Sequence, residues 1–205
     1  MWGIDNFKTN DKIREINNIV SISSVEDPIN TEVIDDNNYK FIDVNFDKLI
    51  NLNDEVVGWI KIPGTNINYP FVQHSDNSYY LNHSFDKTYN NAGWIFLDYR
   101  NNIDLLNTNS IIYAHGRVDG TMFGSLKNIL SDKFDIEKNN VVKISTPYNN
   151  YIFEMFSIYH IPTSNDYLYV GFDDNKYSEF LDLISNRSMI DFNVDVDPND
   201  KLITL

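Results

Sequence analysis

The sequence has no cysteine among its 205 residues. This absence excludes a disulfide framework and any cysteine-ligated metal site within these residues. Long apolar runs are missing as well, since no stretch reaches the roughly 18 apolar residues that a membrane helix needs. The chain becomes polar by Asp5, so its start is not typical of a signal peptide.

Positive charge is also scarce. The sequence has 16 Lys and Arg residues against 30 Asp and Glu residues, which gives a formal net charge of -14 at pH 7. So few cations are poorly suited to neutralising phosphates, which argues against a nucleic acid partner. The same balance argues against electrostatic binding to anionic lipid, whereas a peptide or a cell-wall polymer is compatible with it.

The length and composition support one folded domain, or one domain with a helical extension. Apolar residues make up 42% of the sequence and aromatic residues 14%, enough for a substantial core. Apolar residues at helical spacing predict a helix over residues 4–20, and a polar segment with Pro28 predicts a loop or linker over 21–40. A second short helix is predicted from Phe46 to Leu52, ended by Asn53.

The rest of the chain has the pattern of short strands separated by turns. Strands are predicted over residues 56–62, 67–72, 94–98, 110–113, 141–145, 151–159 and 202–205. Helical segments are predicted over residues 76–81, 122–130 and 177–184. Pro70 places its strand at an edge or bulge of the sheet. This pattern predicts a mainly β fold with peripheral helices, a closed or nearly closed barrel with Trp59 and Trp94 in its core.

One segment carries a residue suited to catalysis. The apolar run Ile111–Tyr113 leads into Ala114, His115 and Gly116. A histidine at the end of a buried strand lies at the rim of a barrel, and its ordinary pKa near neutrality suits proton transfer. His115 is therefore a candidate catalytic residue, although a histidine that simply ends a strand fits the local pattern too.

Other combinations of polar residues are weaker candidates. His74, His83 and His160 match no zinc-ligand spacing with His115, so we expect no metal site. No serine lies in a Gly-x-Ser-x-Gly elbow, which leaves little support for a serine hydrolase. Arg117 could bind an oxyanion, but a solvated loop residue is the better interpretation.

Acidic residues are frequent enough to meet by chance. Asp98, Asp104 and Asp119 could pair for glycoside hydrolysis, which needs two carboxyl groups across the scissile bond. With 30 acidic residues in the sequence, we expect them to belong to a solvated surface instead.

Taken in order, these segments resemble the class B sortases, cell-wall sorting cysteine transpeptidases of Gram-positive bacteria. The resembling segments cover residues 53–60, 63–73, 76–81, 93–98, 113–117, 120–126 and 201–205. Tyr113-Ala114-His115 corresponds to the family's Tyr-Gly-His, with alanine in place of glycine. The last five residues resemble the strand that leads into the family's Thr-Leu-Ser-Thr-Cys. The segments are specific as a set, and each alone would be weak.

The resemblance implies a sortase-type β-barrel over residues 46–205, with residues 1–45 as a helical and linker extension that packs on it. It also implies a nucleophilic cysteine, and an arginine on the following strand, just beyond Leu205. The sequence is therefore expected to lack the last strand or strands of the barrel and to be inactive as given. The family's N-terminal membrane anchor is not among these residues. We expect the protein at the extracellular face of the membrane, in contact with it only through that anchor.

The implied reaction is transpeptidation without a cofactor. A cysteine thiolate attacks the carbonyl after threonine in a C-terminal sorting signal, and an amine of peptidoglycan or its precursor resolves the thioacyl enzyme. By resemblance, His115 serves as general acid and base, while Asn77, Leu81 and Tyr113 help to bind the signal peptide. Asn-Pro-Gln-Thr-like and Pro-x-Thr-Gly-like signals are typical of the family. A non-catalytic peptide-binding barrel of the same fold stays open as the alternative.

Overall fold

The computed structural model of the chain describes residues 2–21, 32–34, 40–102, 104, 107–162, 168–172 and 174–205. Its helices are α1 (Trp2–Ser21), α2 (Phe46–Leu52), α3 (Ile136–Asn139) and α4 (Asp174–Arg187), with 3₁₀ turns η2 (Tyr79–Leu81) and η3 (Leu126–Leu130). Its strands are β1 (Glu32–Ile34), β2 (Lys40–Ile42), β3 (Val56–Lys61), β4 (Asn68–Val72), β5 (Phe96–Leu97), β6 (Asn109–Tyr113), β7 (Val141–Ser145), β8 (Asn150–Glu154) and β9 (Leu202–Thr204). Within these described ranges, no helix is both long and apolar enough to cross a bilayer.

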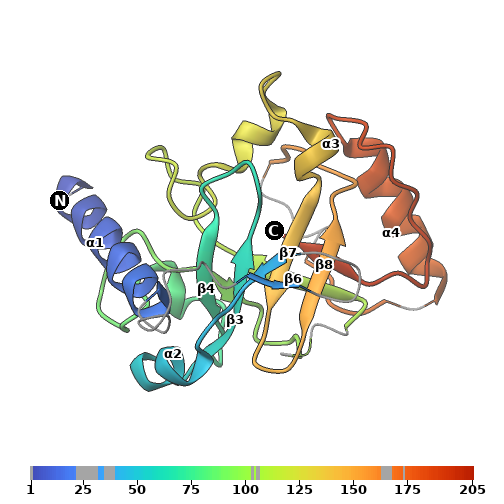
Figure 1. Cartoon of the computed structure of the whole chain (residues 1–205). Helices are drawn as coiled ribbons and strands as arrows, with labels where there is room; N and C mark the ends of the chain where they lie inside the picture. Colours follow the sequence, from blue (N-terminus) through green and yellow to red (C-terminus); the bar gives the residue numbers. More distant parts are fainter. Residues whose placement is uncertain are drawn as a thin grey trace.

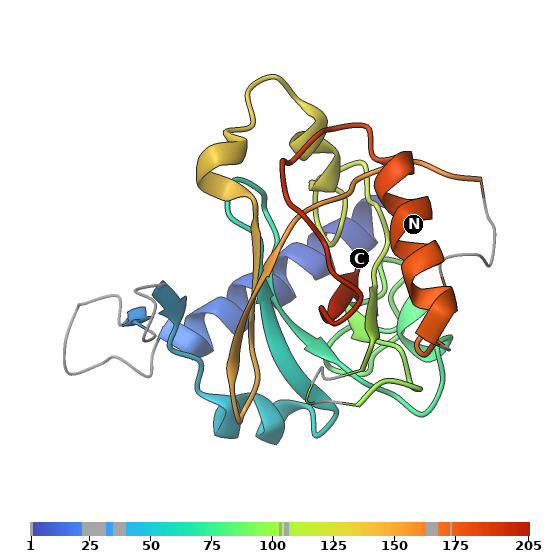
Figure 2. The same ribbon diagram turned by 90° about the vertical axis from the view of Figure 1, so that its right-hand side faces the viewer.

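The main sheet has seven strands in the order β8-β7-β3-β4-β5-β6-β9. Its β4–β5 and β6–β9 pairs are parallel, and its other neighbours are antiparallel. The sheet curls into a nearly closed barrel whose two edge strands are β8 and β9. Helices α1 and α4 lie on opposite sides of it (Figures 1 and 2). The prediction of a mainly β barrel with peripheral helices is confirmed.

The core of the barrel is aromatic and aliphatic. Trp59 and Trp94 are 2% and 1% exposed, as predicted. Their indole N–H groups remain satisfied, because the Trp59 Nε1 donates to the Asn68 Oδ1 and the Trp94 Nε1 donates to the Pro70 carbonyl, both at 2.9 Å. A buried side chain of this size contributes about 1.5–3 kcal/mol by leaving water, so the sheet is a rigid support for the loops at its rim.

A second apolar cluster joins α4 to the edge strand β9. Tyr177, Phe180, Leu181 and Ile184 follow the helical spacing of three and four and form the buried face of α4. Leu202 of β9 packs into the same cluster. The helix predicted over residues 177–184 is therefore confirmed, and its role in the fold is to hold β9 in place.

Helix α1 packs against the barrel near the loop that follows η2. Ile16 is 1% exposed, and the hydroxyl of buried Thr9 accepts a bond of 3.0 Å from the Asn90 side chain. The Lys12 ammonium lies 2.9 Å from the Asp86 carboxylate. The division of the chain into residues 1–45 and 46–205 stays a prediction.

Pro70 lies in an interior strand, so of the two predicted positions, an edge or a bulge, the edge is wrong and the bulge agrees with an irregularity in the β3–β4 pairing. Strand β4 has β3 on one side and β5 on the other. However, β5 pairs with β4 only through Val72 and Phe96, so the missing N–H of Pro70 interrupts no ladder on that side. The pairing is irregular in the neighbouring strand, where the β3 register shifts between Val56 and Gly58.

The helix predicted to start at Met122 starts later, at Leu126. Met122 has a φ of 51°, in the left-handed region, and therefore cannot begin a right-handed helix. At Gly124 an added Cβ would lie 1.9 Å from the Arg117 carbonyl oxygen. The segment is a tight return toward the end of β6, and only its last five residues form the 3₁₀ turn η3.

Several short elements differ from the predicted pattern. Strand β1 lies inside the segment predicted as a loop and pairs antiparallel with β2, which begins at the last residue of that segment, with Val33 opposite Phe41. Helix α3 was not predicted; Asp135 caps it by accepting a 3.3 Å bond from the Lys138 N–H. Strand β5 has only two residues, and β8 ends at Glu154. Elements of two to four residues are too short for their periodicity to be recognised.

Candidate functional site

His115 lies two residues after β6, with its side chain exposed to solvent. Its Nε2 lies 2.7 Å from the carbonyl oxygen of Leu81. A carbonyl oxygen only accepts hydrogen bonds, so Nε2 carries a proton in this arrangement. In the neutral ring, Nδ1 then holds the lone pair. The imidazole is thus accessible and can both give and take a proton.

The loop after His115 is fixed by its own hydrogen bonds. The Phe123 N–H donates to the His115 carbonyl at 3.1 Å, which closes the loop on the end of β6. The Arg117 Nε donates to the Thr121 Oγ1 at 3.0 Å, and its Nη2 lies 3.1 Å from the Asp119 carboxylate. The Arg117 side chain is only 11% exposed. The expectation of a solvated arginine is therefore wrong, because the side chain holds the loop together.

The three residues implied for peptide binding lie near His115. Leu81, at the end of η2, has a 42% exposed side chain, and its carbonyl holds the histidine ring. The Asn77 Nδ2 and the Tyr113 hydroxyl both donate to the Asp98 Oδ2, at 2.8 and 2.9 Å. The structure therefore brings Leu81 to His115, and it brings Asn77 to Tyr113, which lies two residues before the histidine. Their roles in binding and catalysis stay predictions.

Asp98 is a fully buried residue, so its expected place on a solvated surface is wrong. Its side chain is 0% exposed and pairs with Arg100, whose Nε and Nη2 lie 2.8 and 2.7 Å from the two carboxylate oxygens. Burial by itself would raise the Asp98 pKa, but the bonds from Arg100, Tyr113 and Asn77 outweigh it and hold that pKa below its usual range. Burial and the neighbouring carboxylate also raise the pKa of Tyr113.

The sequence held a signal for this buried pair. Asp98 comes directly after the apolar run that forms β5, and Arg100 follows two residues later. A charged residue at the end of a buried strand requires a partner, and an arginine nearby can supply one with two parallel bonds. The abundance of acidic residues obscured this signal.

A second group of titratable side chains lies on the other side of η2. The His74 Nδ1 lies 2.8 Å from the Glu55 carboxylate, and the Tyr79 ring stacks against both His74 and His83, with centroids 4.4 and 4.0 Å apart. Burial would raise the Glu55 pKa, but bonds from Tyr80 and His74 lower it overall. Within the described ranges, no group of three His, Cys, Asp or Glu residues is arranged to hold a metal ion.

The edge strand β9 is aligned with the histidine strand. It runs parallel to β6, with Thr204 opposite Ile111, so its direction leads toward His115. By the same register, Leu205 lies level with Ile112. Any residue that follows in this register approaches the end of β6.

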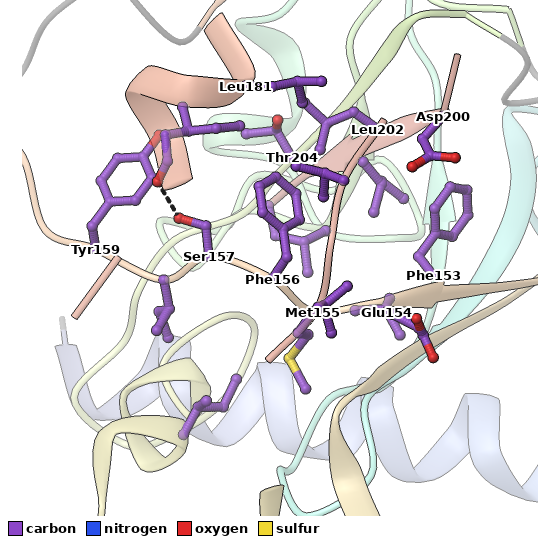
Figure 3. A pocket seen from close by; sticks show the side chains of 18 of the residues that line it. Phe153, Glu154, Met155, Phe156, Ser157, Tyr159, Leu181, Asp200, Leu202 and Thr204 are labelled. Atoms are coloured by element: carbon purple, nitrogen blue, oxygen red, sulfur yellow. Dashed lines mark hydrogen bonds between the residues drawn. The ribbon is translucent and has the colours of Figure 1, made fainter. Parts of the chain in front are cut away.

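A cavity of about 920 Å³ lies between the edge strands, bounded by β8 and the segment after it, by α4 and by β9 (Figure 3). Its lining is largely apolar and includes Phe153, Met155, Leu181 and Leu202. His115 is not among the lining residues. The cavity is therefore a feature of the open side of the barrel, separate from the rim that carries the histidine.

Comparison with known proteins identifies the relatives of this arrangement. The sortase domain family matches residues 60–193. Sortase B of Staphylococcus aureus is 37% identical over 161 residues, which are 78% of this chain and 66% of that protein, so the chain spans less than two thirds of this relative. A Staphylococcus aureus sortase B–substrate complex matches with a TM-score of 0.77 and 30% identity, over 99% of this chain and 88% of that one. A crystal structure of sortase B complexed with Gly3 matches with a TM-score of 0.73 and 36% identity, over 77% of this chain and 74% of that one.

Proposed function

The chain belongs to the sortase family, and on this premise we propose that it is part of a cysteine transpeptidase. The enzyme would cleave a C-terminal sorting signal after threonine and join the signal-bearing protein to a peptidoglycan amine through a thioacyl intermediate. It would work at the outer face of the cell membrane, without a cofactor. The 205 residues contain no cysteine, so by themselves they supply the histidine and part of the groove but not the nucleophile.

The observation that carries the proposal is the register of β9 on β6. Thr204 lies opposite Ile111, so a strand continued in this register would set the third position after Leu205 level with His115. When Thr204-Leu205 is aligned with the first two residues of the family's Thr-Leu-Ser-Thr-Cys, the cysteine falls at this third position after Leu205. Neighbouring strands lie about 4.8 Å apart, and residues at one level share a face. A thiolate there would be within reach of the imidazole.

The chemistry follows from these two groups. The thiolate attacks the carbonyl carbon of the threonine, the bond from this carbon to the next residue's nitrogen breaks, and the His115 imidazolium gives a proton to the leaving amine. The incoming amine then attacks the thioester, the neutral imidazole takes its proton, and the thiolate leaves. An exposed imidazole at the rim suits both steps, because peptide and amine can each reach it.

The proposed partners are a sorting-signal peptide and an amine acceptor. Leu81 contacts His115 through its carbonyl, while Asn77 and Tyr113 share the Asp98 carboxylate, and all three are proposed to line the peptide groove. Two similar proteins have been solved in relevant complexes, one with a substrate and one with Gly3. Those complexes concern the relatives, and they support the same classes of partner for this chain.

A ligation assay tests the proposal. The full-length product of the gene is mixed with an Asn-Pro-Gln-Thr peptide, or with a Pro-x-Thr-Gly peptide, and with triglycine. We expect a product whose mass equals that of the peptide cleaved after threonine plus that of triglycine, less one water. Peptide binding without any cleaved or ligated product would instead support the alternative, a non-catalytic peptide-binding barrel. If the chain neither binds the peptide nor forms a product, both the transpeptidase and the peptide-binding barrel are contradicted.

A further inference from the structure

The Asp98 carboxylate joins separate segments of the chain around the histidine. Asp98 follows β5, Asn77 precedes η2, and Tyr113 ends β6. Phe96 pairs with Tyr113, so Asp98 and Tyr113 are diagonal neighbours on one face of the sheet, where a long side chain can reach across. Asn77 and Tyr113 donate to the same oxygen, Oδ2, at 2.8 and 2.9 Å.

These bonds fix the direction of the Asn77 amide. Its Nδ2 donates to Asp98, and its Oδ1 accepts from the Tyr99 N–H at 3.0 Å. A flipped amide would place an oxygen against a carboxylate and an NH₂ group against a backbone N–H, so only one orientation satisfies both neighbours. One N–H of the amide remains available to a ligand.

Arg100 anchors the carboxylate itself. It makes two parallel side-chain bonds to Asp98, and its backbone N–H adds a third at 2.9 Å. Its Nη2 also donates to the Leu168 carbonyl at 3.1 Å, which ties the segment after β8 to the same pair. Charge-assisted bonds of this kind are stronger and more directional than neutral ones. The carboxylate is thus a rigid point of attachment.

We propose that Asp98 is a positioning residue that presets Asn77 and Tyr113 for the signal peptide. The inference rests on the proposed function for the identity of the ligand. Asp98 would touch neither peptide nor nucleophile. It would hold an amide donor and an aromatic ring in their binding orientation before the peptide arrives, which lowers the entropic cost of binding.

The test compares Asp98→Asn with Asp132→Asn in the full chain. Asp132 is exposed in the loop after η3, so its variant is a matched control for the loss of one carboxylate. Two quantities are measured: the NMR signal of the Asn77 side-chain amide and the affinity for an Asn-Pro-Gln-Thr peptide. In Asp98→Asn we expect a displaced amide signal and about tenfold weaker binding, because the peptide would then have to order the Asn77 side chain itself. In Asp132→Asn neither should change.

The two readouts separate this inference from the proposed function. An Asn77 amide signal unmoved by Asp98→Asn, or an unchanged peptide affinity, overturns the positioning role. If the wild-type chain binds no peptide, the proposed ligand is wrong, while the amide signal still tests whether Asp98 sets Asn77.

A milder pair of variants keeps the inference testable if Asp98→Asn does not fold. Tyr113→Phe removes one donor from the shared oxygen, and Asn77→Ala removes the other. Because both act through Oδ2, their effects on peptide affinity should be non-additive. Strictly additive effects would contradict a common point of attachment.

Discussion

Asp98 and His115 lie in neighbouring parts of one sheet but in opposite surroundings. Asp98 is fully buried and is bonded to three side chains, and burial is tolerated because Arg100 neutralises it. His115 is exposed and rests on a backbone carbonyl that any residue at position 81 would offer. The rim thus combines a fixed part, proposed to hold the peptide, with an accessible part, proposed to transfer protons. Variants that remove one part show whether the other persists.

The largest effect is expected from removing the accessible part. In the full-length product, His115→Ala should lower the rate of ligation by about 10²- to 10⁴-fold, since proton transfer by a positioned side chain contributes that much. The melting temperature should be unchanged, because the side chain is exposed. His160→Ala, an exposed histidine in the segment after β8, is the control and should keep full activity. Wild-type turnover by His115→Ala would remove the catalytic role.

Removing the fixed part should damage the fold. Asp98→Ala leaves Arg100, Asn77 and Tyr113 without their common acceptor, and we expect a loss of about 3 kcal/mol in the free energy of unfolding. Urea unfolding measures it, with Asp132→Ala as the control, expected within about 0.5 kcal/mol of wild type. An equally small change in both variants would show that the buried pair stabilises nothing.

A pair of glycine variants tests whether the loop after His115 is as tightly packed as the structure shows. An added Cβ at Gly124 would meet the Arg117 carbonyl at 1.9 Å, whereas one at Gly116 meets no atom within 4 Å. Gly124→Ala should therefore cost about 1–3 kcal/mol of stability through overpacking, and Gly116→Ala should cost little. Equal melting temperatures for the two variants would argue against the tight return of the loop.

The smallest change in stability is expected when the pH is lowered below about 4. The folded-state pKa of Asp98 is lowered, so its ionised form contributes stability above the unfolded pKa near 3.9 and loses that contribution as pH falls toward the lower native value. The urea concentration at which half of the wild-type protein is unfolded should decrease once the pH is lowered below about 4. The decline should be shallower in Asp98→Asn, and parallel curves would contradict the assignment.

Much of this fold is predictable from local patterns. The mostly apolar runs of β3 and β6 indicate buried strands, and the helical spacing of Tyr177, Phe180 and Leu181 indicates a helix with one buried face. His115 is predictable too, since a histidine at a strand end reaches the rim.

The remaining features depend on contacts between distant segments. Asp98 is an ordinary acid in the sequence and becomes a buried hub only when Asn77 and Tyr113 approach it, across separations of 21 and 15 residues. Pro70 is acceptable in an interior strand only because β5 is short. The late start of η3 follows from the positive φ of Met122, which no periodicity predicts.

The most direct test of the central claim is tandem mass spectrometry of the protein isolated from its native cells, read through Lys201–Leu205 and any residues that follow. The 205 residues account for 23.9 kDa. We expect a larger mass, with Ser-Thr-Cys directly after Leu205 and an arginine in the next strand, so that the thiol lies level with His115. A native protein without a cysteine at that position would contradict it and leave a peptide-binding barrel in its place.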